Sequence, residues 1–291
     1  MKTVAVVGAS LAGLSAARSL RKRGYDGRLV VIGDELHRPY DRPPLSKEFL
    51  AGSLGEADLA LEPDDEDLRA EWLLGVRATG LDGPRRAVRL ADGSEVRVDG
   101  VVIATGAAAR TLPGAEGLAG VHTLRTLDDA RALRDELALG GRLVVIGGGF
   151  IGAEVASTAY ALGLDVTVVE AAPTPLAGPL GAAMGGIVSA LHADHGVRLL
   201  CGVGVKGLRG ESRVEAVLLE DGRSLPADLG CERGELTGAL DTGLQPVAGD
   251  LGEALDDTKQ RLDRMAIESR RPLLGPPAGE GRDPALAEHK A

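Results

Sequence analysis

A glycine turn set between a strand and a helix occurs twice in this chain of 291 residues, and this repeat limits the fold more than any other feature. In the first copy a β-rich run over residues 3–7 leads into the turn 8–13, a helical stretch covers 14–23, and a second apolar run covers 29–32. That order predicts a strand, a helix and a second strand, the βαβ unit that binds dinucleotides. The second copy has its strand at 142–146, its turn at 147–152, its helix at 153–162 and its second strand at 166–169.

Each copy continues into a hairpin, after which the two copies differ. Alternating stretches fold back at acidic–glycine turns, residues 92–93 in the first copy and 221–222 in the second, and predict two β-hairpins. After the first hairpin, the continuous apolar run over 100–106 predicts a buried parallel strand. After the second, residues 230–238 are polar, broken by glycines and without a period, so we expect the repeat to stop at residue 229.

Two further segments lie outside the repeat. Between the copies, Thr126 and Asp129 form a capping box that predicts a helix through Leu137, closed by the glycines at 140–141. Beyond the repeat, we expect one amphipathic helix at about 251–269 and then a disordered tail rich in proline, glycine and charge.

The composition is that of a globular protein with room for two domains, since 44% of the residues are hydrophobic and 26% are charged. The longest apolar runs are far shorter than the roughly 18 residues that cross a bilayer, and the N-terminus lacks a secretory signal, so we expect a cytoplasmic protein without a membrane partner. A net charge of −10 with 2% aromatic residues argues against nucleic-acid binding. Cys201 and Cys231 form no metal or disulfide motif, so redox chemistry would need a bound cofactor.

The second glycine turn carries the full dinucleotide fingerprint. Gly147, Gly149 and Gly152 have the GxGxxG spacing, and Glu170 ends the next strand. The glycines predict that a pyrophosphate approaches a helix N-terminus closely, and the carboxylate predicts a hydrogen bond to a ribose hydroxyl. Because a carboxylate repels a 2′-phosphate and alanines rather than arginines follow at 171–172, we expect NADH rather than NADPH.

The first glycine turn is a weaker match, because Ser10 stands where the middle glycine would be, between Gly8 and Gly13. Its place in a βαβ unit, with Asp34 and Glu35 after the second strand, favours a second dinucleotide site. An ordinary glycine turn without a nucleotide is the alternative. Two such sites in one chain predict electron transfer between two bound cofactors.

Four segments carry a family resemblance, namely residues 7–13, 33–47, 104–106 and 147–154. They closely resemble the FAD-dependent, NADH-using ferredoxin reductases that serve bacterial oxygenases, of the rubredoxin and putidaredoxin type, in the pyridine nucleotide-disulfide oxidoreductase superfamily. The resemblance implies an α/β fold of two Rossmann-like domains, each with a three-layer ββα architecture and the second nested in the first. The expected regions are an FAD-binding domain over 1–113, an NADH-binding domain over 114–229 and an atypical tail over 230–291.

By this resemblance, the first domain would hold FAD and the second NADH. The residues expected to hold the ADP half of FAD are Gly8, Ser10, Gly13, Asp34 and Glu35. Those expected near its pyrophosphate and flavin are Arg42, Lys47, Thr105 and Gly106. Those expected to bind NADH are Gly147, Gly149, Ile151, Gly152 and Glu170.

Lys47 and Glu154 are the expected catalytic pair. The resemblance implies that Glu154 lies close to the flavin ring and pairs with Lys47. A lysine near the flavin N1 and N5 atoms would stabilise the charge of reduced flavin, and a glutamate beside it would position the lysine. From the residues alone, a solvated surface lysine and an acid in the first turn of a helix are the alternatives.

Two features depart from related enzymes. The segment 41–52 holds Ser46 and no cysteine, unlike disulfide reductases of this fold, so electrons would leave the flavin for an external acceptor. The Ala-Gly-Asp at 248–250 matches the signature of the family's returning FAD strand, but Pro246 does not suit a central strand, and we interpret the match as coincidence. We therefore expect the family's C-terminal part to be missing or altered after about residue 229.

Together these observations predict an oxidoreductase that passes electrons from NADH through FAD to a ferredoxin-like iron–sulfur protein, as a monomer or homodimer. Hydride would pass from nicotinamide to flavin, and electrons would then leave singly. Two alternatives stay open: a non-catalytic NAD(H)-binding remnant that has lost FAD, and a flavoenzyme of the NADH oxidase type.

Overall fold

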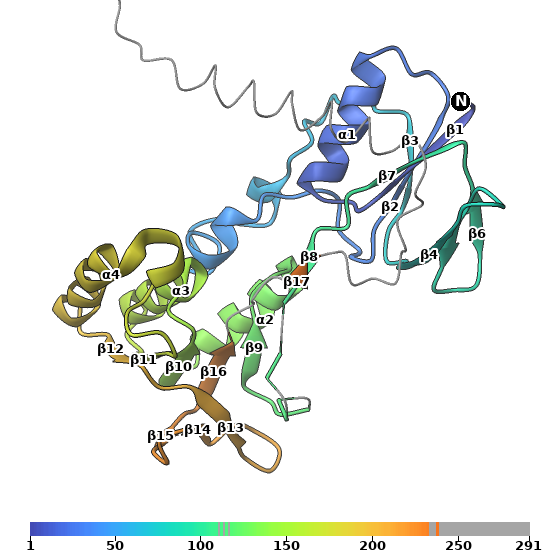
Figure 1. The fold of residues 1–291 in the computed structure, drawn as a ribbon. Helices are drawn as coiled ribbons and strands as arrows, with labels where there is room; N and C mark the ends of the chain where they lie inside the picture. Colours follow the sequence, from blue (N-terminus) through green and yellow to red (C-terminus); the bar gives the residue numbers. More distant parts are fainter. Residues whose placement is uncertain (110, 113, 116, 233–236, 239–291) are drawn as a thin grey trace, which may run out of the picture. The chain divides into compact units, whose positions relative to one another are not determined.

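The computed structural model describes residues 1–238, apart from 110, 113, 116 and 233–236. The helix expected at 251–269, the tail after it and the signature at 248–250 lie outside the described residues. Within the described part, two βαβ units follow one another along the chain, each on its own parallel sheet (Figure 1).

The first unit is built on a four-stranded parallel sheet in the order β3-β2-β1-β7. Helix α1 (Leu11–Lys22) begins within the glycine turn of residues 8–13, before the expected start at residue 14. A three-stranded antiparallel sheet, β4-β5-β6, contains the hairpin predicted at 92–93. The strands are β1 (Thr3–Val7), β2 (Arg28–Ile32), β3 (Ala70–Leu73), β4 (Ala78–Asp82), β5 (Ala87–Leu90), β6 (Glu95–Arg97) and β7 (Gly100–Ile103).

Alternate residues of β1 build the two cores of this unit. Val4 and Val6 pack with Leu14 of α1. Ala5 and Val7 pack against the antiparallel sheet. Because side chains alternate across a strand, the helix covers one face of the parallel sheet and the antiparallel sheet covers the other. This is the three-layer ββα architecture that the resemblance implies, and the prediction is confirmed.

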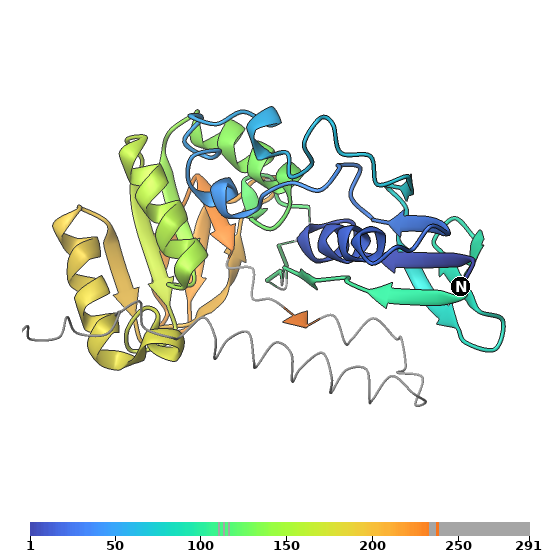
Figure 2. The same ribbon diagram turned by 90° about the horizontal axis from the view of Figure 1, so that it is seen from above.

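The second unit repeats this plan on a five-stranded parallel sheet in the order β12-β11-β10-β16-β9. Helices α3 (Phe150–Ala161) and α4 (Ala177–Asp194) lie next to this sheet (Figure 2). The antiparallel sheet β13-β14-β15 contains the hairpin predicted at 221–222. The strands are β9 (Val121–Thr123), β10 (Arg142–Ile146), β11 (Asp165–Glu170), β12 (Arg198–Cys201), β13 (Val205–Arg209), β14 (Ala216–Leu219), β15 (Ser224–Pro226) and β16 (Leu229–Glu232).

Strand β16 was not expected from the sequence. It pairs with β10 on one side and with β9 on the other, and Leu229 stands opposite Leu143. The prediction that the repeat stops at residue 229 was therefore wrong. A glycine-containing segment forms a strand here because both neighbours supply backbone partners and because Leu229 and Cys231 are buried in the core.

Strand β7, the counterpart of β16 in the first unit, lies at the edge of its sheet. Its parallel pairing with β1 confirms the predicted direction. Its residues are half-buried, however, and Ile103 is 56% exposed. The expectation of a buried strand was wrong because, within the described residues, β7 has a neighbour on one side only.

After β16 the chain returns to the first unit. Strand β17 (Thr237–Gly238) pairs with β8 (Ala107–Ala108), which follows β7. The two partners are far apart in sequence and enclose the whole second unit. This order is the one that the expected nesting requires.

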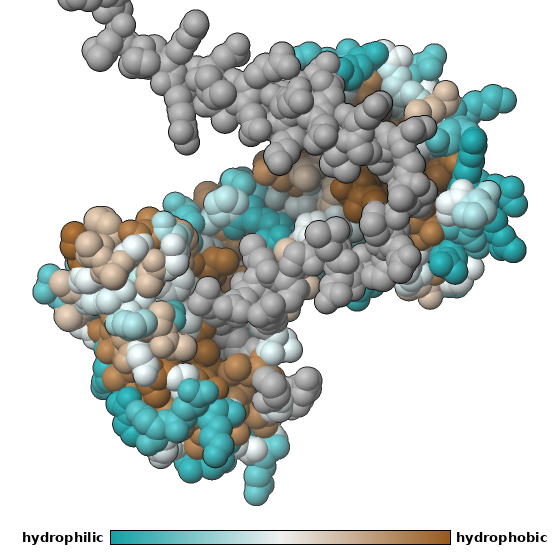
Figure 3. Space-filling view, viewed as in Figure 1, coloured by the Kyte–Doolittle hydropathy of each residue, from teal (hydrophilic) through white to brown (hydrophobic). Residues whose placement is uncertain are grey.

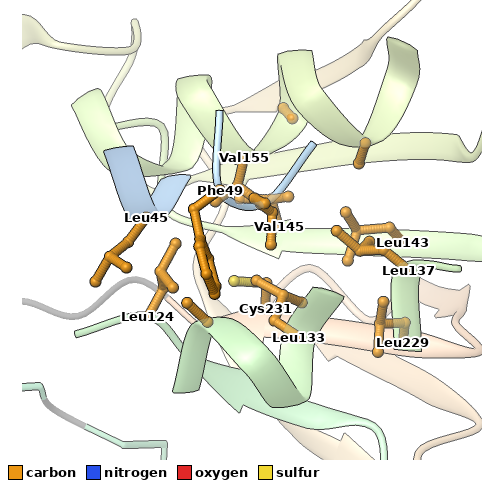
Figure 4. Packing of buried hydrophobic residues seen from close by; sticks show 14 of the residues in the cluster. Leu45, Phe49, Leu124, Leu133, Leu137, Leu143, Val145, Val155, Leu229 and Cys231 are labelled. Atoms are coloured by element: carbon orange, nitrogen blue, oxygen red, sulfur yellow. The ribbon is translucent and has the colours of Figure 1, made fainter. Parts of the chain in front are cut away.

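The segment after β2 belongs to the core of the second unit. Leu45 and Phe49 are buried in the same cluster as residues of α2, α3, β10 and β16. Figure 4 shows Phe49 beside Val155 and Val145, and Leu45 near Leu124. The segment forms the short 3₁₀ helices Pro43–Ser46 and Ala57–Leu59, and the first of these contacts α3. The packing therefore holds a part of the first unit's chain against the helix of the second glycine turn.

Helix α2 (Leu127–Leu137) starts as predicted. The Thr126 hydroxyl accepts the N–H of Asp129 at 3.1 Å, and the Asp129 carboxylate accepts the N–H of Thr126 at 2.8 Å, which completes the capping box. The N–H of Leu127 is satisfied from outside the helix, by Tyr40 Oη at 2.9 Å. The first turn of α2 is thus tied to the segment after β2.

Helix α4 has no counterpart among the predicted elements. It is broken at Gly181, where φ is +78°, and no charged residue lies between Glu170 and Asp194. Its outer face is apolar, and the surface over α4 at the left of Figure 3 is brown and tan. The large exposed side chains of this helix are Leu180, Met184, Ile187 and Leu191. None of the helices that the structure describes is long and apolar enough to cross a membrane.

Candidate functional site

A cavity of about 980 Å³ opens beside the first glycine turn. This volume is typical of cofactor sites. Its wall includes the ends of β1 and β2, the residues directly after β7, and the starts of α1 and α2. The predicted site residues that line it are Gly8, Ser10, Asp34, Glu35, Arg42, Thr105 and Gly106.

The third glycine of each turn leaves no room for a side chain. A Cβ on Gly13 would lie 1.8 Å from the carbonyl oxygen of Gly8, and a Cβ on Gly152 would lie 2.1 Å from that of Gly147. Both distances are far below van der Waals contact. The two turns therefore share one geometry, in which the loop folds back over the first turn of its helix.

Ser10 replaces the middle glycine of the first turn without strain. Its φ is −124°, in the extended region, and Gly149 at the same place in the second turn has φ −78°. Neither conformation requires glycine. The Ser10 hydroxyl accepts a hydrogen bond from Arg42 Nε at 3.1 Å, so this departure from the fingerprint adds a polar contact at the cavity wall.

Glu35 is engaged by two side chains of its own segment. Arg42 Nη2 donates to Glu35 Oε1 and Tyr40 Oη donates to Glu35 Oε2, each at 2.5 Å. Burial and the hydrogen bond to Glu35 raise the pKa of Tyr40, so the phenol stays protonated as the donor. Asp34 and Glu35 both line the cavity, but Asp34 is exposed, whereas both Glu35 oxygens are already engaged. Asp34 is thus better placed than Glu35 to receive hydroxyl groups of a ligand.

Arg125 is a cavity residue that the sequence analysis missed. Its Nε donates to the carbonyl of Ala107 at 2.9 Å, and its own carbonyl accepts Arg42 Nη1 at 2.6 Å. Burial and the nearby Arg42 guanidinium lower the pKa of Arg125 from its ordinary value. Two cations crowded at one wall favour a bound anion. The only signal in the sequence was an arginine directly before a capping box.

At the second glycine turn, Glu170 is buried and bridges the turn to its own strand end. Its Oε2 accepts the N–H of Gly148 at 2.7 Å, and its Oε1 accepts the N–H of Ala172 at 2.8 Å. Gly147 and Gly149 precede α3 as predicted, and Ile151 packs against the buried cluster. The structure thus brings the glycine turn and the carboxylate together at the end of the sheet, as the fingerprint requires.

Lys47 and Glu154 meet where the segment after β2 packs on α3. Lys47 Nζ lies 2.9 Å from Glu154 Oε2, although the two residues are 107 positions apart. Lys47 follows the short helix that packs on α3, and Glu154 lies in α3 itself. The ion pair that the resemblance implies is therefore formed. Lys47 is not part of the wall of the cavity at the first turn.

The residues present fit a dinucleotide at each turn. At the first, the start of a 12-residue helix, two guanidinium groups and the exposed carboxylate of Asp34 match a pyrophosphate and a ribose. At the second, the glycine turn, the start of α3 and Glu170 offer the same chemistry without an arginine.

Comparison with known proteins gives a consistent result. Residues 2–231 match the family described as pyridine nucleotide-disulphide oxidoreductase. The chain is 44% identical over 228 residues to the ferredoxin–NAD(+) reductase subunit of the benzene 1,2-dioxygenase system of Pseudomonas putida, covering 77% of this chain and 55% of the relative. It is 46% identical over 228 residues to the ferredoxin reductase component of chlorobenzene dioxygenase from Cupriavidus sp. (strain PS12), with coverage of 77% and 55%.

Solved structures agree. The covalent complex of putidaredoxin reductase with putidaredoxin matches 80% of this chain and 58% of that chain, with a TM-score of 0.76 and 37% sequence identity. The chain spans just over half the length of the curated relatives that it matches.

Proposed function

Because the chain belongs to the pyridine nucleotide-disulphide oxidoreductase family, we propose that it is an FAD-dependent oxidoreductase that passes electrons from NADH through FAD to a ferredoxin-like iron–sulfur protein. One observation carries the proposal: in a chain with two glycine-turn units, the segment that follows β2 of the first is held on the helix of the second, where Lys47 and Glu154 form an ion pair. A domain that only bound one nucleotide would not need a charged pair between two such units. The names of the relatives, a ferredoxin–NAD(+) reductase subunit and a ferredoxin reductase component, support a ferredoxin-like electron acceptor.

We assign FAD to the first unit, over residues 1–113. Arg42 and Arg125 would face its pyrophosphate, and Asp34 would receive hydroxyl groups of its adenosine ribose. The start of α1 adds backbone N–H groups and the positive end of a helix dipole. Glu35 and Tyr40 would hold Arg42 in place, and Glu35 also lines the cavity.

We assign NADH to the second unit, over residues 114–229. The start of α3 would receive the pyrophosphate, and Glu170, fixed by two backbone N–H groups, would accept a ribose hydroxyl. A carboxylate at that place repels a 2′-phosphate, which favours NADH over NADPH.

Lys47 and Glu154 would act where the two cofactors meet. Bound FAD supplies the hydride acceptor and the store from which electrons leave singly. Lys47 would place a positive charge beside the flavin, and Glu154 would hold that charge in position. We place the reaction in the cytoplasm, where NADH is available, with the protein acting as a monomer or homodimer.

The decisive experiment is a flavin and NADH titration of the purified chain. After incubation with FAD and desalting, the protein is expected to be yellow, and NADH is expected to bleach it without oxygen and to support reduction of a ferredoxin. A colourless protein that binds NADH in calorimetry would favour the NAD(H)-binding alternative. Oxygen consumption without ferredoxin reduction would favour an NADH oxidase.

A further inference from the structure

Ser46 lies between the two members of the ion pair and is more buried than either. Ser46 is 5% exposed, whereas the side chains of Lys47 and Glu154 are 39% and 34% exposed. The Ser46 hydroxyl donates to Glu154 Oε2 at 2.5 Å, and this is the oxygen that Lys47 Nζ reaches at 2.9 Å. A buried hydroxyl therefore contacts the carboxylate oxygen on which the ion pair depends.

The direction of these hydrogen bonds follows from the groups involved. An ammonium only donates, and a carboxylate only accepts. Lys47 Nζ also lies 3.5 Å from Ser46 Oγ. Of the two acceptors within reach of the hydroxyl, Glu154 Oε2 at 2.5 Å is much closer than the Pro43 carbonyl at 3.4 Å, so the hydroxyl gives its one hydrogen to Glu154. The three groups form a triangle, in which the direct contact between Lys47 and Ser46 is the longest and weakest side.

Ser46 is itself anchored by the helix that carries Glu154. Thr158, one turn further along α3, donates its hydroxyl to the Ser46 carbonyl at 3.0 Å. Ser46 also ends the 3₁₀ helix Pro43–Ser46, which contacts α3. The serine is thus fixed by backbone and packing, whereas Glu154 and Lys47 are longer side chains with several rotatable bonds.

We propose that Ser46 is a positioning residue, whose hydroxyl holds Glu154 Oε2 at the place where Lys47 Nζ meets it and so fixes the lysine ammonium. The consequence for the flavin rests on the proposed function, because only there does Lys47 stand beside a cofactor. The positioning of the Lys47 ammonium does not depend on a bound cofactor, so it can be measured in the cofactor-free chain.

The test measures how fast Lys47 reacts with an amine-directed reagent in the cofactor-free chain. Labelling is followed by mass spectrometry at one pH, with exposed Lys22 as the internal standard. Ser46→Ala is expected to raise the labelling rate of Lys47 about threefold or more, because a hydrogen bond to a charged group is lost. Glu154→Gln is expected to raise it at least as much.

Non-additivity decides the route by which Ser46 acts. If the hydroxyl works through Glu154, the double variant Ser46→Ala/Glu154→Gln labels Lys47 at the same rate as Glu154→Gln alone. An unchanged rate in Ser46→Ala alone, or a further rise in the double variant, would overturn the proposal. A general loosening of the fold is recognised separately, because it lowers Tm, whereas loss of the hydroxyl contact alone is expected to change the Lys47 rate with little change in Tm.

Ser53→Ala is the matched control. Ser53 lies in the same segment, and its hydroxyl donates to the carbonyl of Glu48 at 3.1 Å, with no contact to Glu154. The variant loses one serine hydroxyl bond without touching the triangle. Its Lys47 labelling rate is expected to equal that of the unaltered chain.

A second measurement uses the chain with FAD bound. Ser46→Ala is expected to make the flavin harder to reduce, since a displaced lysine stabilises the reduced flavin less, and to have no added effect beside Glu154→Gln. If the unaltered chain takes up no flavin, the proposed function fails. The labelling rates of the cofactor-free chain then still decide the role of Ser46.

Discussion

The carboxylate of Asp228 accepts three hydrogen bonds from Arg142: from its backbone N–H at 3.0 Å, from Nη2 at 2.8 Å and from Nε at 2.9 Å. This contact ties the start of β16 to the start of β10. Asp99 makes the same backbone contact in the first unit, where it accepts the N–H groups of Lys2 and Thr3 at 2.7 and 2.9 Å before β7 begins. The repeat thus includes an aspartate that sets the register of a strand.

Asp228→Asn is expected to destabilise the protein at neutral pH and to matter less in acid. The Arg142 side chain and backbone lower the pKa of Asp228 from 3.8 to about 2. Because the pKa of Asp228 is lower in the folded than in the unfolded chain, its carboxylate stabilises the fold fully above about pH 4. This stabilisation disappears as the pH falls towards about 2. Since the side chain is 47% exposed, we discount for solvent screening and expect a loss of about 1 kcal/mol at pH 7.

Urea unfolding, followed by circular dichroism at several pH values, measures the free energy of unfolding of both proteins. The difference in this free energy between the unaltered chain and Asp228→Asn should decrease below pH 4, towards about zero near pH 2. A gap that stayed constant with pH would show that the carboxylate charge does not contribute.

Tyr40→Phe is expected to cost about 1–3 kcal/mol of stability, because it leaves the buried N–H of Leu127 and a half-buried Glu35 oxygen without their partner. The phenol is 7% exposed, so water does not readily replace it. Chemical denaturation measures the loss. Tyr160→Phe, at a tyrosine that is 44% exposed, is the control and should change stability by less than about 0.5 kcal/mol.

Asp34→Ala and Glu35→Ala should separate ligand binding from structure. Asp34 faces the cavity and is exposed, so its loss is expected to weaken FAD about tenfold with little change in Tm. Glu35 is held by Tyr40 and Arg42, so its loss should lower Tm as well. Calorimetric titration with FAD and thermal unfolding measure the two effects. Equal losses of Tm in both variants would contradict the assignment.

Arg125→Gln is expected to weaken FAD binding about tenfold to a hundredfold, the range for losing a hydrogen bond to a charged group. Arg125 and Arg42 crowd one wall of the cavity, and an anion between them would relieve their repulsion. Arg85→Gln is a suitable control, because Arg85 has a side chain that is 72% exposed and does not line the cavity. Flavin fluorescence quenching measures both affinities, and equal values would refute the role of Arg125.

The parts of the fold that the sequence predicted are those governed by local chemistry. The glycine turns, the capping box at Thr126 and the acidic–glycine hairpins depend on backbone geometry within a few residues, and all of them are present. Strand β16 and the exposure of β7 could not be predicted in this way. Each depends on how many neighbouring strands it has, which is a property of the assembled sheet.

The same division holds for the site. The glycines and Glu170 follow a spacing rule, and the resemblance indicated Arg42, Lys47 and Glu154. Arg125 and Tyr40 act through contacts that join segments more than 80 residues apart, and their local sequence does not show these contacts. Ser46 was noted only as the absence of cysteine, while its contact with Glu154 spans 108 positions.

Phe49→Ala tests whether the segment after β2 is held by the core of the second unit. Phe49 is fully buried among residues of α2, α3 and β10, and the Arg134 guanidinium stacks on its ring at 4.6 Å. Removing the ring should cost about 3–5 kcal/mol, as for other buried aromatic side chains. Leu139→Ala, at a residue that is 77% exposed, is the control and should cost less than about 0.5 kcal/mol.

Because Phe49 is two residues from Lys47, Phe49→Ala should also raise the labelling rate of Lys47 under native conditions. A destabilised protein with an unchanged Lys47 rate would mean that the ion pair holds the segment without help from the core.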